Sequence, residues 1–278
     1  MTYKIVSDSA VNLLKLKSDV PYARVPLTIS TAEREFVDAE NLDINEMLSY
    51  LKAYKGKSGS ACPSVAAWLE AFGDAENVFA VAITSGLSGS YNSACVAKEE
   101  YETTHPGRRV YVIDTLSAGA EMTLIIEKLE ELILQGKNFE TICEEVRSYM
   151  EHTGLLFSLE SLKNLANNGR VNPVVARLAG TLGICIVGKA SDQGTLEQMA
   201  KCRGEKKALL TLYKYMKEMG YAGGKVCIDH CLNINAAEQV KNMILADYPE
   251  AEIAIDITRG LCSFYAETMG LLVGFEKA

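Results

Sequence analysis

One stretch constrains the fold of this chain more than any other: an apolar run that ends abruptly in glycines and small hydroxyl residues. Residues 78–83 read VFAVAI, and residues 84–90 continue as TSGLSGS. A short apolar run bounded by turn residues is typical of a buried strand, and the pattern YNSACVAKEEYE from Tyr91 onward favours a helix. The hydroxyl groups between the two elements belong to Thr84, Ser85, Ser88 and Ser90.

These hydroxyl groups fall where a strand ends and a helix begins. Ligands bind at that place in an open α/β sheet, because unpaired N–H groups and the positive end of the helix dipole point there. The side chains of residues 84–90 are uncharged. Uncharged hydroxyl groups can bind a carboxylate through hydrogen bonds without neutralising its charge or reacting with it. The stretch therefore predicts an anion-recognition turn.

The remaining chain alternates between apolar runs and helical patterns, which predicts an α/β fold. We expect strands at residues 3–6, 23–28, 78–83, 110–113, 155–157, 183–187, 225–228, 252–257 and 271–275. Helical spacing is found at residues 43–56, 63–73, 117–135 and 138–152.

The pattern changes near Thr153-Gly154, after two successive helices. We expect residues 1–153 to form a Rossmann-like domain with a parallel sheet. Further on, strands at 183–188 and 195–200 lie close together in the sequence, which favours antiparallel pairing. Residues 154–278 are therefore expected to form a second α/β domain with a mixed sheet.

Composition excludes several classes of partner. The net charge of −8 disfavours nucleic acid and anionic membrane surfaces, which bind proteins rich in Lys and Arg. The first residues lack the apolar core of a signal peptide, and no stretch approaches 18 uncharged apolar residues. We expect a cytoplasmic protein without a membrane segment, in which the eight cysteines act mostly as small buried side chains.

Two further segments resemble parts of the anion-recognition turn. Ser58, Ser60 and Ser64 surround Pro63 before a helical pattern. They fit either a second anion site at a helix start or ordinary N-capping, and the nearness of residues 84–90 favours convergence on one site. Asp114 ends a third strand, and capping is the favoured interpretation of its carboxylate.

Catalytic and metal sites are weaker interpretations of the same residues. The run Gly86-Leu87-Ser88-Gly89-Ser90 approaches a nucleophile elbow, which would make Ser88 the nucleophile of a serine hydrolase or esterase, but the fifth position should be Gly. Cys227, His230 and Cys231 lack the second pair that a zinc site needs, so no metal is expected. Cysteines on a core strand explain that cluster better.

Six segments in order resemble the signature series of the DegV family across nearly the whole chain. They are SDSAVNL near the start, SxxPS at 60–64, ITSGLSGSYNSA, VIDTLSAG, NNGRV at 167–171 and KCRGEKKAL. The resemblance implies a two-domain α/β protein that binds one long-chain fatty acid in a tunnel between the domains. It also implies a carrier that performs no chemistry and needs no cofactor. A separate ATP-binding fatty acid kinase subunit would phosphorylate the acid that the carrier presents.

The resemblance assigns roles residue by residue. The head-group contacts of the family fall on Ser60 and Ser88, with Ser85 close by. The family arginines associated with kinase docking or with phosphate match Arg170 and Arg203. Arg170 also stands out by itself, because an arginine in a turn can bind a phosphate or carboxylate through two hydrogen bonds.

Three departures from the family pattern bear on the ligand. Ser60, Ala61 and Cys62 replace Thr-Ser-Gln, Cys185-Ile186 replaces Lys-Pro, and the C-terminal His-x-Gly-Pro-Gly motif is absent. Tyr265 stands near the place of the missing histidine, and Tyr265 or Arg259 would supply the lost donor. A carrier for a different amphiphilic carboxylate is the alternative.

Overall fold

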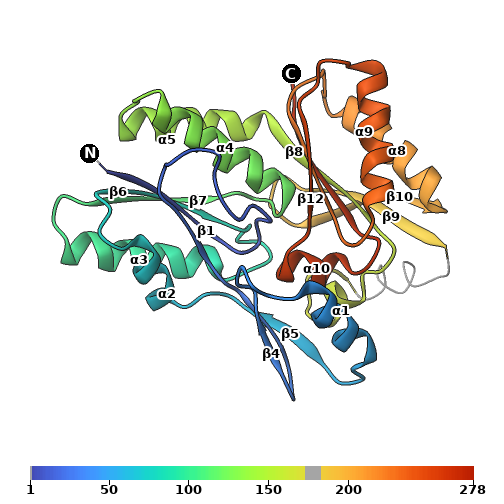
Figure 1. Cartoon of the computed structure of the whole chain (residues 1–278), viewed down its shortest axis with the longest axis horizontal. Coiled ribbons are helices and arrows are strands. Elements are labelled where there is room, and N and C mark those ends of the chain that lie inside the picture. The colour runs from blue at the N-terminus through green and yellow to red at the C-terminus, as the bar shows by residue number, and fades with distance from the viewer. Residues whose placement is uncertain (1, 173–182) are drawn as a thin grey trace.

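The computed structural model describes residues 2–172 and 183–278, and it has an α/β fold with two large sheets (Figure 1). The first sheet is parallel throughout, in the order β2-β1-β6-β7. Its strands are β1 (Tyr3–Asp8), β2 (Tyr22–Val25), β6 (Asn77–Ala82) and β7 (Arg109–Asp114). The parallel sheet expected in the first half of the chain is confirmed.

Helices cover both faces of the parallel sheet, which explains why β6 is buried at every position and apolar at nearly all of them. Alternate β6 residues pack into two separate cores, one on each face. One face lies under α2 (Val65–Phe72) and α3 (Ser90–Thr104), and the other lies under α4 (Ala120–Leu134) and α5 (Phe139–Glu151).

The second sheet is mixed, in the order β10-β9-β8-β13-β11-β12. Among its described strands only β11 and β12 pair in parallel, and the predicted antiparallel pairing of β9 with β10 is confirmed. Its strands are β8 (Thr153–Leu159), β9 (Ile184–Ala190), β10 (Leu196–Arg203), β11 (Val226–His230), β12 (Ile253–Ile257) and β13 (Leu271–Glu276).

The mixed sheet is covered on its outer face by α8 (Glu205–Glu218) and α9 (Ile234–Asp247). Helix α4 lies against strands of both large sheets, so it is buried nearly all round (Figure 1). The boundary between residues 153 and 154 stays a prediction. It falls within β8, which begins at Thr153 and is the first strand of the mixed sheet along the chain.

A third, small antiparallel sheet, in the order β4-β3-β5, was not expected. It consists of β3 (Thr28–Thr31), β4 (Glu35–Val37) and β5 (Ser58–Ala61), and it lies close to α1 (Ile44–Ala53), α6 (Lys163–Asn167) and α10 (Gly260–Ala266). Ser60 was expected just before the helical pattern at 63–73, and it lies within β5. The alternative of ordinary N-capping is confirmed for Ser64. Helix α2 begins later, where the Ser64 hydroxyl accepts the Ala67 N–H at 3.2 Å.

Buried polar contacts join the first half of the chain to the second. The Asn12 amide donates to the Asp229 carboxylate at 2.6 Å, and its oxygen accepts the Arg259 N–H at 2.6 Å. The Asp38 carboxylate accepts the N–H groups of Gly260 and Leu261 at the start of α10, both at 2.8 Å. The conformation of α10 therefore depends on residues from the N-terminal half.

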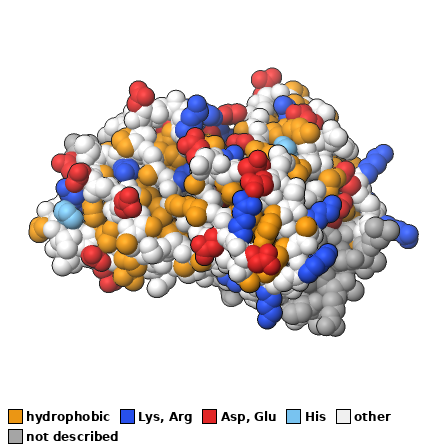
Figure 2. Space-filling view, turned by 60° about the horizontal axis from the view of Figure 1, so that its bottom comes forward, with side chains coloured by type: hydrophobic (Ala, Val, Ile, Leu, Met, Phe, Trp, Pro, Cys, Tyr) orange, Lys and Arg blue, Asp and Glu red, His pale blue; other side chains and the backbone are white. Residues whose placement is uncertain are grey.

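Basic and acidic side chains are interspersed on the face of the molecule shown in Figure 2, with hydrophobic side chains exposed between them. Within residues 2–172 and 183–278, no helix is both long enough and apolar enough to span a bilayer.

Candidate functional site

The serine-rich turn between β6 and α3 is held by carboxylates from both neighbouring strands. Asp8 at the end of β1 accepts the Ile83 N–H at 2.9 Å and the Ser90 hydroxyl at 2.6 Å. Asp114 at the end of β7 accepts the Ser85 N–H at 3.0 Å. Because the three strands are parallel, their carboxyl ends meet at one edge and bring these groups together. Asp114 therefore braces the turn and does not cap a helix.

The Asp8 carboxyl is fully buried beneath this turn. Burial raises its pKa to about 6, although hydrogen bonds from Ser90, Ile83 and Ala10 favour the charged form. A carboxylate of the protein itself thus accepts the Ser90 hydroxyl at the start of α3. The Ser88 oxygen accepts the Ser90 N–H at 3.3 Å, and its own O–H can donate to a ligand.

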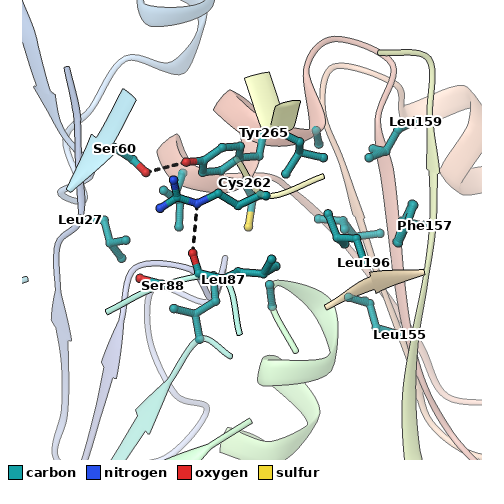
Figure 3. A pocket seen from close by; sticks show the side chains of 17 residues that line it. Leu27, Ser60, Leu87, Ser88, Leu155, Phe157, Leu159, Leu196, Cys262 and Tyr265 are labelled. Carbon is teal, nitrogen blue, oxygen red and sulfur yellow. Dashed lines mark hydrogen bonds between the residues drawn. The ribbon is translucent and has the colours of Figure 1, made fainter. Parts of the chain in front are cut away.

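An apolar pocket lies between this turn and the mixed sheet (Figure 3). It has an empty volume of about 700 Å³, part of which is open to solvent. One wall is formed by Leu155, Phe157 and Leu159, alternate residues of β8 that share one face of the sheet. Others come from Leu196 on β10 and from α10.

Polar groups gather at the other end of this pocket, where Ser60 and Ser88 lie (Figure 3). The hydroxyl groups of Ser60 and Tyr265 are 2.7 Å apart. Among the described residues that line the pocket, Arg170 alone carries a charge at pH 7, and its Nε donates to the Leu87 carbonyl at 3.1 Å. A chain that is apolar along its length and anionic at one tip matches this arrangement.

Three predicted site residues lie outside the set that lines the pocket. Ser85 is exposed, and its N–H is used by Asp114. The Arg259 guanidinium donates to the Glu40 carbonyl at 2.7 Å, and the Arg259 backbone N–H donates to Asn12. Arg203 is exposed at the end of β10. Tyr265 and Arg259 were the two candidates to replace the missing histidine. Of these two, Tyr265 lines the pocket and Arg259 does not.

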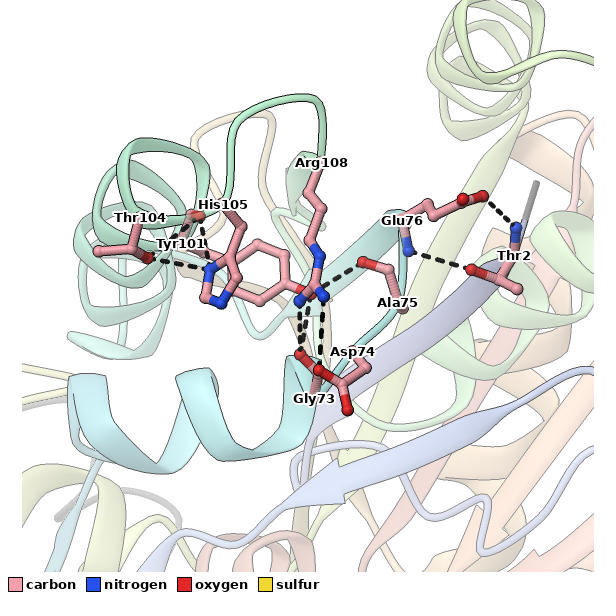
Figure 4. Close-up of polar contacts among 9 residues, drawn as sticks. All are labelled: Thr2, Gly73, Asp74, Ala75, Glu76, Tyr101, Thr104, His105 and Arg108. Atoms are coloured by element: carbon pink, nitrogen blue, oxygen red, sulfur yellow. Dashed lines mark hydrogen bonds and ion pairs between the residues drawn. The ribbon is translucent and has the colours of Figure 1, made fainter.

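Ser88 has no histidine beside it within the part of the chain that the structure describes. His105 lies beyond the opposite end of α3, where it contacts Thr104 and the Tyr101 carbonyl (Figure 4). His152 bonds to the Ser148 carbonyl at the end of α5, and His230 accepts the Asn233 N–H at the end of β11. No serine hydrolase triad forms around Ser88.

The other motifs lie where the plainer interpretation placed them. The glycine- and lysine-containing run at residues 183–189 lies almost entirely in β9, and its middle positions are buried. Cys227 and His230 belong to β11. No group of three His, Cys, Asp or Glu side chains suited to a metal occurs among residues 2–172 and 183–278.

One contact between the serine-rich turn and the mixed sheet could not be predicted from the sequence. The Thr84 hydroxyl donates to the Gly194 carbonyl at 2.9 Å, which fastens the tip of the β9–β10 hairpin to the serine-rich turn. Gly194 has φ of +69°, and a side chain on it would overlap the Thr84 hydroxyl. The acceptor is a backbone carbonyl, so no side-chain pattern marks it; a glycine in a tight turn is the only signal.

Comparison with known proteins gives matches along the whole chain. The family model described as "Uncharacterised protein, DegV family" matches residues 2–274. A relative from Streptococcus pneumoniae serotype 4, named "DegV domain-containing protein", is 44% identical over 279 residues, which cover 99% of each chain.

Two solved structures are also closely similar. A DegV family protein from Eubacterium eligens loaded with heptadecanoic acid has a TM-score of 0.97 and 45% identity, covering 99% of this chain and 100% of its own. The Streptococcus pneumoniae Fatty Acid Kinase (Fak) B3 protein loaded with linoleic acid has a TM-score of 0.98 and 44% identity, covering 100% of both chains.

Proposed function

This chain belongs to the DegV family, and on that premise we propose that it binds a long-chain fatty acid and presents it to a separate fatty acid kinase subunit. The observation that supports the proposal most is the division of one pocket into two ends. Ser60, Ser88, Tyr265 and Arg170 provide polar groups at one end, and leucines and a phenylalanine of the mixed sheet line the other.

The acyl chain supplies the affinity in this proposal. Burying about fifteen methylenes at about 0.8 kcal/mol each gives roughly 12 kcal/mol before the costs of association are subtracted. A neutral hydrogen bond contributes only about 1 kcal/mol net. The hydroxyl groups of Ser60, Ser88 and Tyr265 therefore mainly decide which end of the ligand faces outward.

Arg170 adds a charged hydrogen-bond donor to the polar end of the pocket. Its guanidinium lines the pocket beside the residue pair Leu87 and Ser88. Hydrogen bonds from a guanidinium to a carboxylate or an acyl phosphate are roughly twice as strong as neutral ones. Arg170 is thus proposed to hold the anionic head before and after phosphorylation. ATP belongs to the kinase subunit, so the carrier has no cofactor of its own.

Identification of the bound ligand tests the carrier proposal directly. Protein purified from cells is measured by native mass spectrometry and then extracted with organic solvent. A fatty acid in a one-to-one complex with the chain is expected. An extract that contains only short polar metabolites would refute fatty acid binding and would indicate that the protein carries a different carboxylate.

The kinase partnership needs its own experiment. Arg203 is exposed on β10 and outside the pocket, so Arg203→Ala is expected to leave fatty acid binding unchanged and to slow acyl phosphate formation by an added kinase subunit. Lys214→Ala is the control, because it removes a positive charge from the exposed face of α8 nearby in the sequence. Equal rates for both variants would argue against docking through Arg203.

A further inference from the structure

One face of β8 runs from the apolar pocket into a second cavity. Side chains of alternate residues share a face of a strand, so Leu159, Phe157, Leu155 and Thr153 form one row. The first three line the apolar pocket. Leu155 and Thr153 also line the second cavity, which makes Leu155 the one member of this row that belongs to both.

The second cavity is polar where the first is apolar. The Thr153 hydroxyl donates to the buried Glu121 carboxylate at 2.7 Å, directly beyond Leu155 in the row. Lys189 and Lys277 line the same cavity, whose empty volume of about 1410 Å³ includes open solvent. A methylene that passed Leu155 would therefore leave apolar walls and meet charged groups and water.

We propose that Leu155 ends the acyl pocket and thereby limits the length of the chain that this protein holds. The inference rests on the proposed function and deepens it by naming a residue that determines specificity. Leu155 is only 3% exposed and packs against Leu124 and Ala120 of α4, so its side chain is fixed in place. The wall is therefore rigid, and a longer acid cannot push it aside at low cost.

Truncation of this wall should move the preferred chain length. Leu155→Ala removes three carbon atoms, so the optimum is expected to move to acids about two or three methylenes longer. Each added methylene that finds apolar space should raise the affinity about fourfold. The measurement is competition binding with a series of saturated acids on delipidated protein, and Leu155→Val should give a smaller shift in the same direction.

Leu156→Ala is the matched control. Leu156 is the next residue of the same strand and is equally buried, but it points into the core under α8 on the opposite face. Its truncation should lower thermal stability to a similar extent and leave the length preference unchanged. An unchanged optimum in both Leu155 variants, or an equal shift in Leu156→Ala, overturns the role of Leu155.

The two proposals fail separately. Wild-type protein that binds none of the acids refutes fatty acid binding itself. Wild-type protein that binds them, together with folded Leu155→Ala and Leu155→Val variants that keep the wild-type optimum, refutes only the role of Leu155.

Discussion

The hydroxyl groups of Ser60 and Tyr265 lie 2.7 Å apart and join β5 to α10 across 205 positions of the sequence. Tyr265 belongs to the segment that stands where the family carries a histidine. The pair therefore brings two uncharged hydroxyl groups, each able to donate or accept a hydrogen bond, to the polar end of the pocket.

Tyr265→Phe tests this pair. The variant keeps the ring that packs against Phe264 and removes one hydroxyl, so fatty acid affinity should fall by about 1 kcal/mol, or roughly fivefold. Competition binding measures the change. Tyr3→Phe serves as the control, because it loses one hydrogen bond to the Lys137 carbonyl outside the pocket. An equal loss in both variants would mean that the Tyr265 hydroxyl has no special role.

Ser88→Ala distinguishes a carrier from a hydrolase. In a carrier the change should weaken acid binding by about 1 kcal/mol and reduce transfer to the kinase, since the acyl chain still provides most of the affinity. A fluorophosphonate probe should label neither the wild-type protein nor the variant. Labelling of wild-type protein at Ser88 would instead establish a nucleophilic serine.

Gly194→Ala should separate the hairpin from the serine-rich turn. The new side chain would overlap the Thr84 hydroxyl, so both stability and fatty acid affinity should fall. Gly136→Ala is a close control, because Gly136 has nearly the same φ, +70°, and nothing within 4 Å of the added carbon. The control should lose about 1 kcal/mol of stability from backbone strain. Denaturant titration and binding of both variants would show any excess loss at Gly194.

Asp229 should make the free energy of unfolding depend on pH. Burial raises the pKa of this carboxyl from 3.8 to about 7, despite the hydrogen bond from Asn12. The folded chain then holds a proton that the unfolded chain releases above pH 4. The contribution of Asp229 to the free energy of unfolding therefore falls as pH rises from about 4 to about 7, by up to about 4 kcal/mol, and is level above that.

Asp229→Asn isolates that contribution. The amide mimics the protonated carboxyl and can still accept from Asn12. Asp8 and Asp38 remain in both proteins, so only the difference between the two stability curves is compared. We expect the free energy of unfolding of the variant to rise relative to that of the wild type as pH increases from about 4 to about 7. Parallel curves in urea unfolding at several pH values would contradict the assignment.

The sequence predicted the two large sheets because burial leaves a pattern. Strand β6 is buried at every position and therefore reads as a nearly continuous apolar run, and the polar residues that end it mark the functional edge. Strand β5, with the sequence SGSA, has no apolar alternation and is recognised only through its pairing with β3. The sequence therefore predicted the helix that follows Pro63 but not the short strand that contains Ser60.

The site itself was predictable only in part. Ser60, Ser88 and Tyr265 were named from the sequence and line one pocket, although Tyr265 was located only by counting from residues 273–275. The position of Arg170 on that pocket depends on the path of the chain after α6, which no local pattern specifies. The turn-like sequence around Arg170 and the resemblance to the family both pointed to this residue, but only the fold shows that it lines the pocket.

The buried contacts of Asn12 limit how such a protein can be recombined. Asn12 holds Asp229 through its amide nitrogen and the backbone of Arg259 through its oxygen, so one side chain from the first half fixes two points of the second. A chimera that joined the N-terminal half of this chain to the C-terminal half of a relative without the matching aspartate would leave a buried amide unpaired. The two halves of this protein are therefore not interchangeable modules, because the buried contacts between them depend on matching residues in both.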